Sequence, residues 1–160
     1  MRNHSMRKSN SSKAEFSTRS LKPDELLFVY GTLRQGTDSV PYQKFMDGLE
    51  YFAIGYMRGC LFEVDGYPGA IESNSKDERV WGDLFVLRDP IRSLNAIDEY
   101  EECSERFDKP HEYVRKKSKI YLSDGDSTYA WSYIYNRPTA GLEKIKSGDY
   151  LDYLGLRHSV

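Results

Sequence analysis

The sequence of 160 residues has little of what defines several protein classes. It has two cysteines, Cys60 and Cys103, and neither a Cys-x-x-Cys pair nor histidines at zinc-ligand spacing. A disulfide scaffold and a zinc finger are therefore excluded, and we assign no metal ligand. No apolar run approaches the roughly 18–20 residues that a membrane-spanning helix needs, so we expect no membrane partner. The net charge of only −2 gives no overall case for a nucleic-acid partner.

The chain does have enough apolar surface for one folded domain. Hydrophobic residues make up 39% of it and aromatic residues 14%, with 13 tyrosines among them. Its length lies in the range of about 100–200 residues that is usual for a single domain. Because aromatic side chains favour strands, the composition indicates a structure rich in β-sheet. We expect this domain to span residues 23–160.

Residues 1–22 differ from the rest of the sequence. They carry six basic residues against one acid, are rich in serine and asparagine, and show no apolar period. Such a segment cannot bury enough surface to offset its ordering entropy, so we predict a disordered basic tail. Transit peptides share its composition, but a solvated tail is the simpler interpretation. The apolar region of a secretory signal is absent, and we therefore expect a cytoplasmic location.

The hydrophobic patterns predict more strands than helices. A helix is expected to open at Asp89-Pro90, where aspartate serves as the N-cap and proline takes the first helical position. The segment 123–126 reads as a hairpin turn between two alternating strands. Because the strands are mostly sequential, we predict the α+β class with a largely antiparallel sheet or small barrel. The expected strands cover 26–30, 49–56, 58–64, 70–72, 80–87, 113–122 and 128–135, with helical segments at 40–46, after 89 and, weakly, at 138–154.

The first candidate site follows the first apolar strand, in Tyr30-Gly31-Thr32-Leu33. A glycine there permits positive φ and a close approach of the backbone. Successive backbone N–H groups in such a turn form an anion-binding nest, which suits a carboxylate or a phosphate. Considered alone, a strand followed by a glycine turn is more often structural.

The second candidate is the acidic segment Asp98-Glu99-Tyr100-Glu101-Glu102, which ends the helix that opens at Pro90. It can be a solvated acidic face. However, the negative end of the helix dipole and the neighbouring acids both disfavour ionisation of a carboxylate there. An inward-facing carboxylate would thus have a raised pKa and could act as a general base near neutral pH. The spacing of Leu94 and Ile97 makes Glu101 the acid that points inward.

With these residues, the sequence resembles the γ-glutamylcyclotransferase-like (AIG2-like) family. Tyr30-Gly31-Thr32-Leu33 is similar to the family's Y-G-[S/T]-L signature, and six further short motifs follow in the family's order. The six are Gly66-Tyr67-Pro68-Gly69-Ala70, Val80-Trp81-Gly82-Asp83-Leu84-Phe85, Ile97-Asp98-Glu99-Tyr100-Glu101, Tyr113-Val114-Arg115, Ala130-Trp131-Ser132-Tyr133-Ile134-Tyr135 and Ser147-Gly148-Asp149-Tyr150. The resemblance extends along most of residues 26–153.

The resemblance implies a fold, a reaction and a set of site residues. The fold would be a small mixed, mainly antiparallel β-barrel flanked by helices, with a pocket at one end. The α-amine of a γ-glutamyl compound, such as a γ-glutamylamine, would attack its own γ-carbonyl and release 5-oxoproline without a cofactor. Tyr30, Gly31, Thr32 and Leu33 would bind the glutamyl part, and Glu101 would be the catalytic acid and base. Tyr113 is a candidate pocket wall, with plain barrel packing as the alternative.

One position departs from the family pattern. The glycine that follows the catalytic glutamate in the family is Glu102 here. Glycine adopts the positive φ of a helix-ending turn at little cost, so Glu102 should be strained or should need another turn geometry. A second carboxylate beside Glu101 should also raise its pKa further. The charged segment 103–111 is expected to line or cap the pocket mouth.

Two functions of different classes follow from these observations. The first is a γ-glutamyl cyclotransferase that acts on a small-molecule γ-glutamyl substrate. The second is a module that binds a γ-glutamyl-like or other small anionic ligand without chemistry. The sequence leaves open the leaving group, the oligomeric state and the role of the basic tail.

Overall fold

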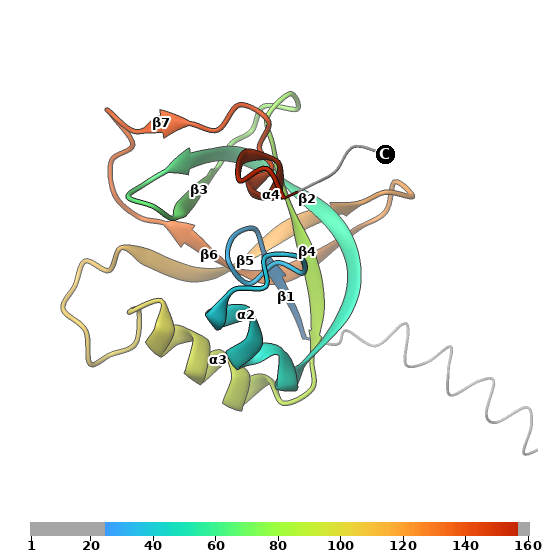
Figure 1. The fold of residues 1–160 in the computed structure, drawn as a ribbon, viewed down its shortest axis with the longest axis vertical. Coiled ribbons are helices and arrows are strands. Elements are labelled where there is room, and N and C mark those ends of the chain that lie inside the picture. The colour runs from blue at the N-terminus through green and yellow to red at the C-terminus, as the bar shows by residue number, and fades with distance from the viewer. Residues whose placement is uncertain (1–24, 157–160) are drawn as a thin grey trace, which may run out of the picture.

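The computed structural model describes residues 25–156, and the predicted tail at 1–22 lies outside them (Figure 1). Most of the expected strands and the two expected helices of the first hundred residues are found close to their predicted bounds. In chain order the elements are β1 Leu26–Val29, α2 Val40–Phe45, η1 Met46–Gly48, β2 Leu49–Glu63, β3 Pro68–Glu72, β4 Arg79–Leu87, α3 Pro90–Tyr100, β5 Tyr113–Leu122, β6 Ser127–Tyr135, β7 Glu143–Lys144 and α4 Tyr150–Tyr153.

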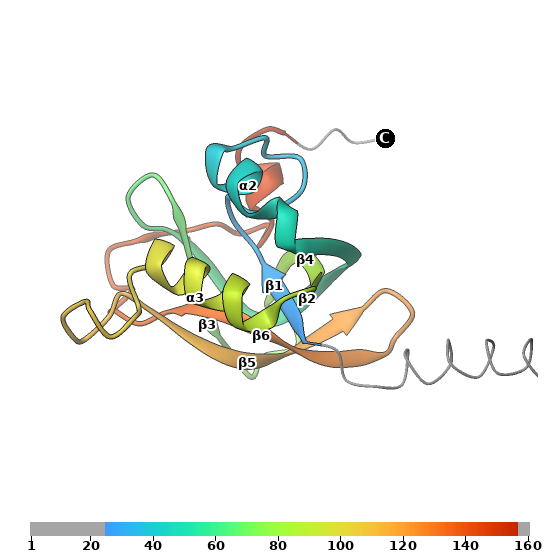
Figure 2. The same ribbon diagram turned by 90° about the horizontal axis from the view of Figure 1, so that it is seen from below.

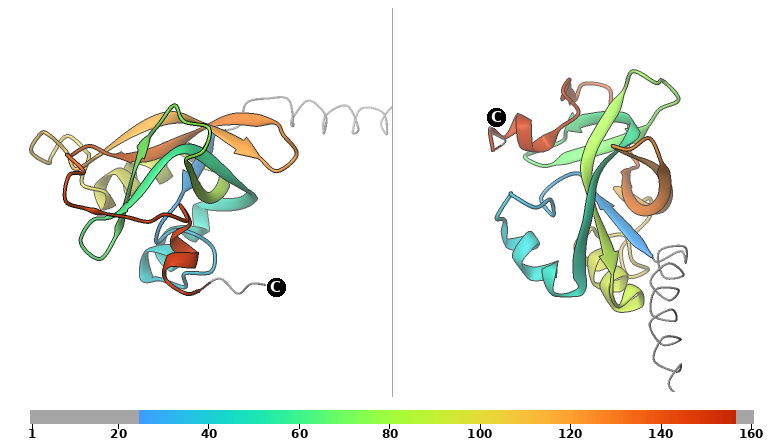
Figure 3. Two further views of the ribbon diagram at one scale, coloured as in Figure 1. Left: turned by 90° about the horizontal axis from the view of Figure 1, so that it is seen from above. Right: turned by 90° about the vertical axis from the view of Figure 1, so that its right-hand side faces the viewer.

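Five of the strands close into a small mixed barrel, which confirms the predicted fold class. Around the barrel the order is β2, β4, β1, β6 and β5, and a further pairing of β5 with β2 closes it. Strands β1 and β6 are parallel, whereas the other pairs are antiparallel. Strands β3 and β7 pair with the second half of β2 and extend beyond the barrel, as Figures 1 and 3 show.

Strand β2 is one strand of 15 residues, so the prediction of two strands separated by a glycine turn is wrong. Its glycines lie within the strand because neighbouring strands approach them closely. A Cβ added at Gly55 would lie 2.8 Å from Ile120 Cγ2 on β5, where the barrel closes. At Gly59 the same atom would lie 2.3 Å from the carbonyl oxygen of Ile71 on β3. The glycines of β2 thus permit close strand pairing and do not end the strand.

Helix α3 lies against the outside of the barrel beside α2 (Figures 1 and 2). Its N-cap is Asp89, as predicted, and its side chain accepts a hydrogen bond from the backbone N–H of Arg92. Leu94 and Ile97 are buried in the second of two hydrophobic clusters, together with the side chains of β1 that point away from the barrel interior. Ile91, in the first turn of the helix, is 76% exposed and is not part of this cluster.

The C-terminal segment is less helical than predicted. Between residues 138 and 154 only Tyr150–Tyr153 forms an α-helix, while Glu143–Lys144 pairs with β2. The helix begins at Asp149, whose carboxylate accepts hydrogen bonds from two backbone N–H groups. Within residues 25–156, no helix has the length and apolar character that crossing a membrane requires.

A buried group of charges joins the segment after β1 to β4 and to the start of α4. Arg34, Asp83 and Asp149 have relative exposures of 1%, 3% and 8%. The guanidinium of Arg34 lies 3.0 Å from Asp149 and 3.4 Å from Asp83, and Asp83 also accepts a hydrogen bond of 2.8 Å from the backbone N–H of Gln35. Because buried charges are stable only when paired, this arrangement fixes the segment that follows Gly31.

Replacing Arg34 tests this role. In Arg34→Ala, the cation that balances two buried carboxylates is lost, and we expect the free energy of unfolding to fall by about 3–5 kcal/mol in urea titrations. The control is Arg88→Ala, which removes an exposed contact of 3.7 Å to Glu50 and should cost less than about 1 kcal/mol. Equal losses in the two variants would contradict the role of the buried charges.

Candidate active site

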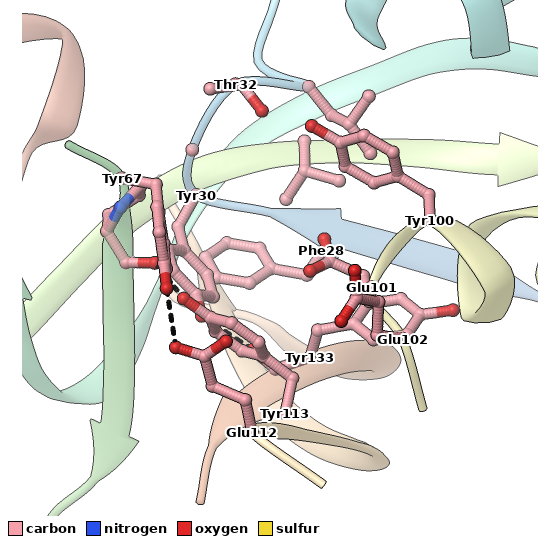
Figure 4. Close-up of a pocket in the computed structure, with 14 residues that line it drawn as sticks. Phe28, Tyr30, Thr32, Tyr67, Tyr100, Glu101, Glu102, Glu112, Tyr113 and Tyr133 are labelled. Carbon is pink, nitrogen blue, oxygen red and sulfur yellow. Dashed lines mark hydrogen bonds between the residues drawn. The ribbon is translucent and has the colours of Figure 1, made fainter. Parts of the chain in front are cut away.

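A cavity of about 430 Å³ lies where the end of β1, the β2–β3 turn, the end of α3 and the first residues of β5 meet (Figure 4). All the site residues singled out from the sequence line it: Tyr30, Gly31, Thr32, Leu33, Glu101 and Tyr113. The fold therefore brings together the glycine loop and the acidic helix end, which are about seventy residues apart in the sequence. The other lining residues are Phe28, Val29, Tyr67, Pro68, Tyr100, Glu102, Glu112 and Tyr133.

The glycine loop is shaped by close packing and by hydrogen bonds to its carbonyl groups. Gly31 does not have the positive φ that the sequence suggested. Glycine is needed there because an added Cβ would lie only 2.8 Å from Pro68 Cγ. The carbonyl of Gly31 accepts a hydrogen bond of 3.0 Å from the backbone N–H of Arg34, and that of Thr32 accepts one of 2.6 Å from the Ser39 hydroxyl.

The backbone donors of this loop remain available to a ligand. No hydrogen bond within residues 25–156 uses the backbone N–H of Gly31, Thr32 or Leu33 as its donor. Because each of these residues lines the cavity, the loop offers a short run of amide donors next to it. Such a run suits an anionic group, as the nest interpretation predicts.

Glu101 caps the C-terminal end of α3, and its backbone N–H donates to the carbonyl of Ile97 at 2.8 Å. The side chain is partly buried beside the cavity, and its carboxylate accepts no hydrogen bond from any of the residues 25–156. Burial raises the pKa of the Glu101 carboxyl from 4.5 to about 7, with smaller contributions from the charges of Glu112 and Glu102. A carboxyl group with this pKa can both accept and donate a proton near neutral pH.

Glu102 takes the position where a helix-ending turn favours glycine, and its φ is +60°. The backbone N–H of Cys103 donates to the carbonyl of Asp98 at 2.9 Å, and that of Glu102 donates to the carbonyl of Glu99 at 3.2 Å. These two bonds define a Schellman turn. The turn of the family pattern is therefore kept, and the expected strain falls on the backbone of Glu102. Its charge also raises the pKa of Glu101, as expected, although Glu112 contributes more.

Glu112 is a lining residue that the sequence reasoning missed. Its carboxylate accepts a hydrogen bond of 2.7 Å from the Tyr67 hydroxyl, which comes from the β2–β3 turn. The only sequence signal was its place directly before Tyr113, at the start of a predicted strand. The segment 103–111 was expected to line the pocket mouth, but none of its residues lines this cavity. Several of them instead face a separate hollow of about 790 Å³ together with Arg115 and Trp131.

Five tyrosines line the cavity, and the hydroxyl groups of four of them donate hydrogen bonds to protein groups, namely those of Tyr30, Tyr67, Tyr113 and Tyr133. The Tyr30 hydroxyl donates to the carbonyl of Tyr133 at 2.6 Å, and the Tyr113 hydroxyl donates to the carbonyl of Pro68 at 2.6 Å. Burial raises the pKa of both tyrosines. Tyr113 is both a wall and part of the second hydrophobic cluster, so its two sequence interpretations hold together.

Comparison with known proteins connects this cavity to a described family. A family model for gamma-glutamyl cyclotransferase, AIG2-like proteins matches residues 27–152. Gamma-L-glutamyl-butirosin B gamma-glutamyl cyclotransferase of Niallia circulans is 33% identical over 112 residues, which cover 69% of this chain and 67% of that protein. The gamma-glutamylcyclotransferase family protein YtfP of Escherichia coli K12 is 29% identical over 127 residues, or 79% of this chain and 96% of that protein.

Solved structures show the same fold. An AIG2-like protein from Mus musculus superimposes with a TM-score of 0.64 at 20% identity, covering 87% of this chain and 97% of that protein. The solution structure of YtfP from Escherichia coli gives a TM-score of 0.54 at 28% identity, covering 80% and 97%.

Exchanging Glu102 for glycine tests the strain in the turn. A side chain at positive φ costs roughly 1–2 kcal/mol that glycine avoids, so Glu102→Gly should raise the free energy of unfolding by about 1 kcal/mol. Urea titration measures this. Glu105→Gly, at an exposed position without positive φ, is the control and should give no gain. A loss of stability in Glu102→Gly would contradict the assignment of strain.

Proposed function

This chain belongs to the gamma-glutamyl cyclotransferase, AIG2-like family, and from that premise we propose that it converts a γ-glutamylamine or a related γ-glutamyl compound into 5-oxoproline and a free amine. The observation that carries the proposal is the presence of Glu101 and the glycine loop on one cavity. The first can move a proton near neutral pH, and the second can hold an anion. Neither alone would support a cyclisation.

The glycine loop would hold the glutamyl end of the substrate. The backbone N–H groups of Gly31, Thr32 and Leu33 would donate to the α-carboxylate through charge-assisted hydrogen bonds. Tyr30 and Tyr113 would form the walls, and the cavity would keep the glutamyl chain bent. Bending is the main requirement, because well-oriented intramolecular reactions reach effective molarities of about 10⁵–10⁸ M.

Glu101 would carry the proton through the reaction. Its carboxylate accepts a proton from the α-ammonium, and the resulting amine attacks the γ-carbonyl carbon to close a five-membered ring. The γ-carbonyl oxygen becomes an oxyanion, which backbone donors can stabilise. As the carbonyl re-forms, the bond to the leaving amine breaks, and Glu101 returns the proton to that nitrogen. The ring nitrogen still carries two hydrogens after its attack, and it passes the second proton through the ionised Glu101 to the released amine, so the products are the neutral lactam and an ammonium ion. Substrate and side chain supply every atom that these steps need.

The charge of the cavity supports an amine as the leaving group. Its lining includes Glu101, Glu102 and Glu112, and no lysine, arginine or histidine among the described residues. After Glu101 has served the α-amine, two carboxylates remain to face the leaving group. These carboxylates would repel an amino acid as the leaving group, through its own carboxylate, but would not repel an amine that lacks one.

Removing the ionisable group of Glu101 tests the mechanism. Glu101→Gln keeps the size of the side chain but cannot carry a proton, so 5-oxoproline formation should fall by a factor of about 10³ or more in a chromatographic assay. In the unchanged protein, kcat/KM should rise with pH up to about 7 and then level, because Glu101 must be deprotonated to accept a proton.

The control is Glu99→Gln, which changes an acid of the same helix end that is exposed and pairs with Arg106. It should keep nearly full activity. If Glu101→Gln and the unchanged protein both bind a γ-glutamyl amide and neither yields product at any pH, the protein is a binding module and the enzymatic proposal fails.

The leaving-group argument is tested with three γ-glutamyl amides of matched length, made from hexylamine, 1,5-diaminopentane and 6-aminohexanoic acid. The carboxylate-bearing amide should have a kcat/KM at least about tenfold below that of the other two, because like charges repel in the cavity. Glu112→Gln should reduce this difference in kcat/KM. Equal kcat/KM values for all three amides would rule out a role of the lining charges in selecting the substrate.

A further inference from the structure

Asp98 and Arg115 belong to the family-like motifs but have no part in the mechanism above. They meet in a two-pronged ion pair between α3 and β5. The Nε of Arg115 lies 2.8 Å from Asp98 Oδ1, and its second donor lies 3.1 Å from Asp98 Oδ2. Both side chains are mostly buried, and the guanidinium also stacks on Trp131 at 4.5 Å. Paired donors of this kind fix orientation as well as distance.

Asp98 holds the end of α3 through both its side chain and its main chain. The carboxylate is held by Arg115 and also accepts a hydrogen bond of 2.6 Å from the Tyr133 hydroxyl. Its carbonyl accepts the bond from Cys103 that closes the Schellman turn. Because Asp98 and Glu101 are three residues apart on this helix, fixing the first limits how the backbone of the second can move.

Tyr133 extends this connection to the opposite side of the cavity. While its hydroxyl donates to Asp98, its carbonyl accepts the bond of 2.6 Å from the Tyr30 hydroxyl. Tyr30 in turn accepts a bond of 3.2 Å from the backbone N–H of Ala70 and directly precedes the glycine loop. A continuous series of hydrogen bonds therefore runs from Arg115 to the residue beside Gly31.

The carboxylate of Glu101 has no such support of its own within residues 25–156, so its place depends on the turn that carries it. We propose that Asp98 and Arg115 are a positioning pair that holds Glu101 against the cavity, at a set distance from the glycine loop. The inference rests on the proposed function for its kinetic consequence. Its structural part, that the pair keeps Glu101 buried, does not depend on the proposed function.

The test is a charge-balanced double variant, Asp98→Asn/Arg115→Gln, since removing one charge alone would alter Glu101 electrostatically. The matched control is Glu99→Gln/Arg106→Gln, which removes an ion pair of 2.6 Å from the same helix end, where both side chains are largely exposed. In each protein, kcat and KM for a γ-glutamyl amide are measured, and the Glu101 carboxyl is titrated by carbon-13 NMR. Circular dichroism and thermal unfolding establish that each variant is folded.

The pKa of Glu101 depends on all the ionisable groups around it, so these groups must be considered together. The groups whose charge interacts with it are Glu102 on the same turn, Cys103 just beyond it, Tyr30 from β1, Glu112 before β5 and Tyr113 on β5. None of them is changed in the double variant. A fall in the pKa of Glu101 would therefore report loss of its burial.

If the pair positions Glu101, the double variant should lose about 10- to 100-fold in kcat with KM changed less than about threefold, because small displacements of a reacting group cost this much. The pKa of Glu101 should fall from about 7 towards 4.5, while the control keeps both values. Arg115→Lys keeps the charge but loses the paired donors, so it should lower kcat, whereas Arg106→Lys at the exposed pair should not, and this comparison serves as the test if the double variant does not fold.

An unchanged kcat and an unchanged Glu101 titration in the folded double variant would overturn the inference. So would an Arg115→Lys variant with the kcat of the unchanged protein. If the unchanged protein forms no 5-oxoproline, the proposed function fails instead. The titration then decides the positioning claim alone, since it needs no substrate.

Discussion

The arrangement of the site depends on one unfavourable interaction, the burial of the Glu101 carboxylate at the end of a helix. A carboxyl group binds its proton more tightly where water is excluded, and here the pKa rises from 4.5 to about 7. Because the folded state holds this proton more tightly than the unfolded state, stability declines as the pH rises between these values. Above pH 7 the cost is about 3 kcal/mol, a sizeable part of the stability of a small domain. The remaining contacts of the barrel must outweigh it.

Two separate groups of charges hold the two sides of the cavity. On one side, Arg34 binds Asp83 and Asp149 and thereby fixes the segment after Gly31 to β4 and to the C-terminal helix. On the other side, Asp98 and Arg115 fix the end of α3 to β5. Strand β1, which leads into the glycine loop, and strand β5, which carries Arg115, both pair with β6 in the same barrel. In each group the charges are largely removed from water, and every carboxylate lies beside a guanidinium of opposite charge, which lets the group fix geometry without leaving a buried charge unpaired.

The sequence predicted those features of the fold and site that depend on neighbouring residues. Helical spacing identified Glu101 as the inward acid. The family pattern has glycine at the next position, so the sequence also predicted backbone strain at Glu102. Features that depend on residues far away in the sequence could not be predicted from it. Arg34 is buried because of residues 49 and 115 positions away, and no local pattern marks it. Gly55 resembles a turn residue in the sequence, yet it sits inside β2 because β5 packs against it. Glu112 reaches the cavity only through the path of the preceding loop.

Burial raises the pKa of Glu101, and the tyrosines around the cavity do not lower it again. A hydroxyl that donated to its carboxylate would stabilise the ionised form and lower the pKa. Tyr30 and Tyr113 donate instead to backbone carbonyl groups, and Tyr133 donates to Asp98. None of the described residues thus offers the Glu101 carboxylate a hydrogen bond, and its carboxyl group stays a weak acid. In the proposed reaction, the strongest donor that a γ-glutamyl substrate presents to Glu101 is its own ammonium group, and one proton of that group is the proton that Glu101 would remove.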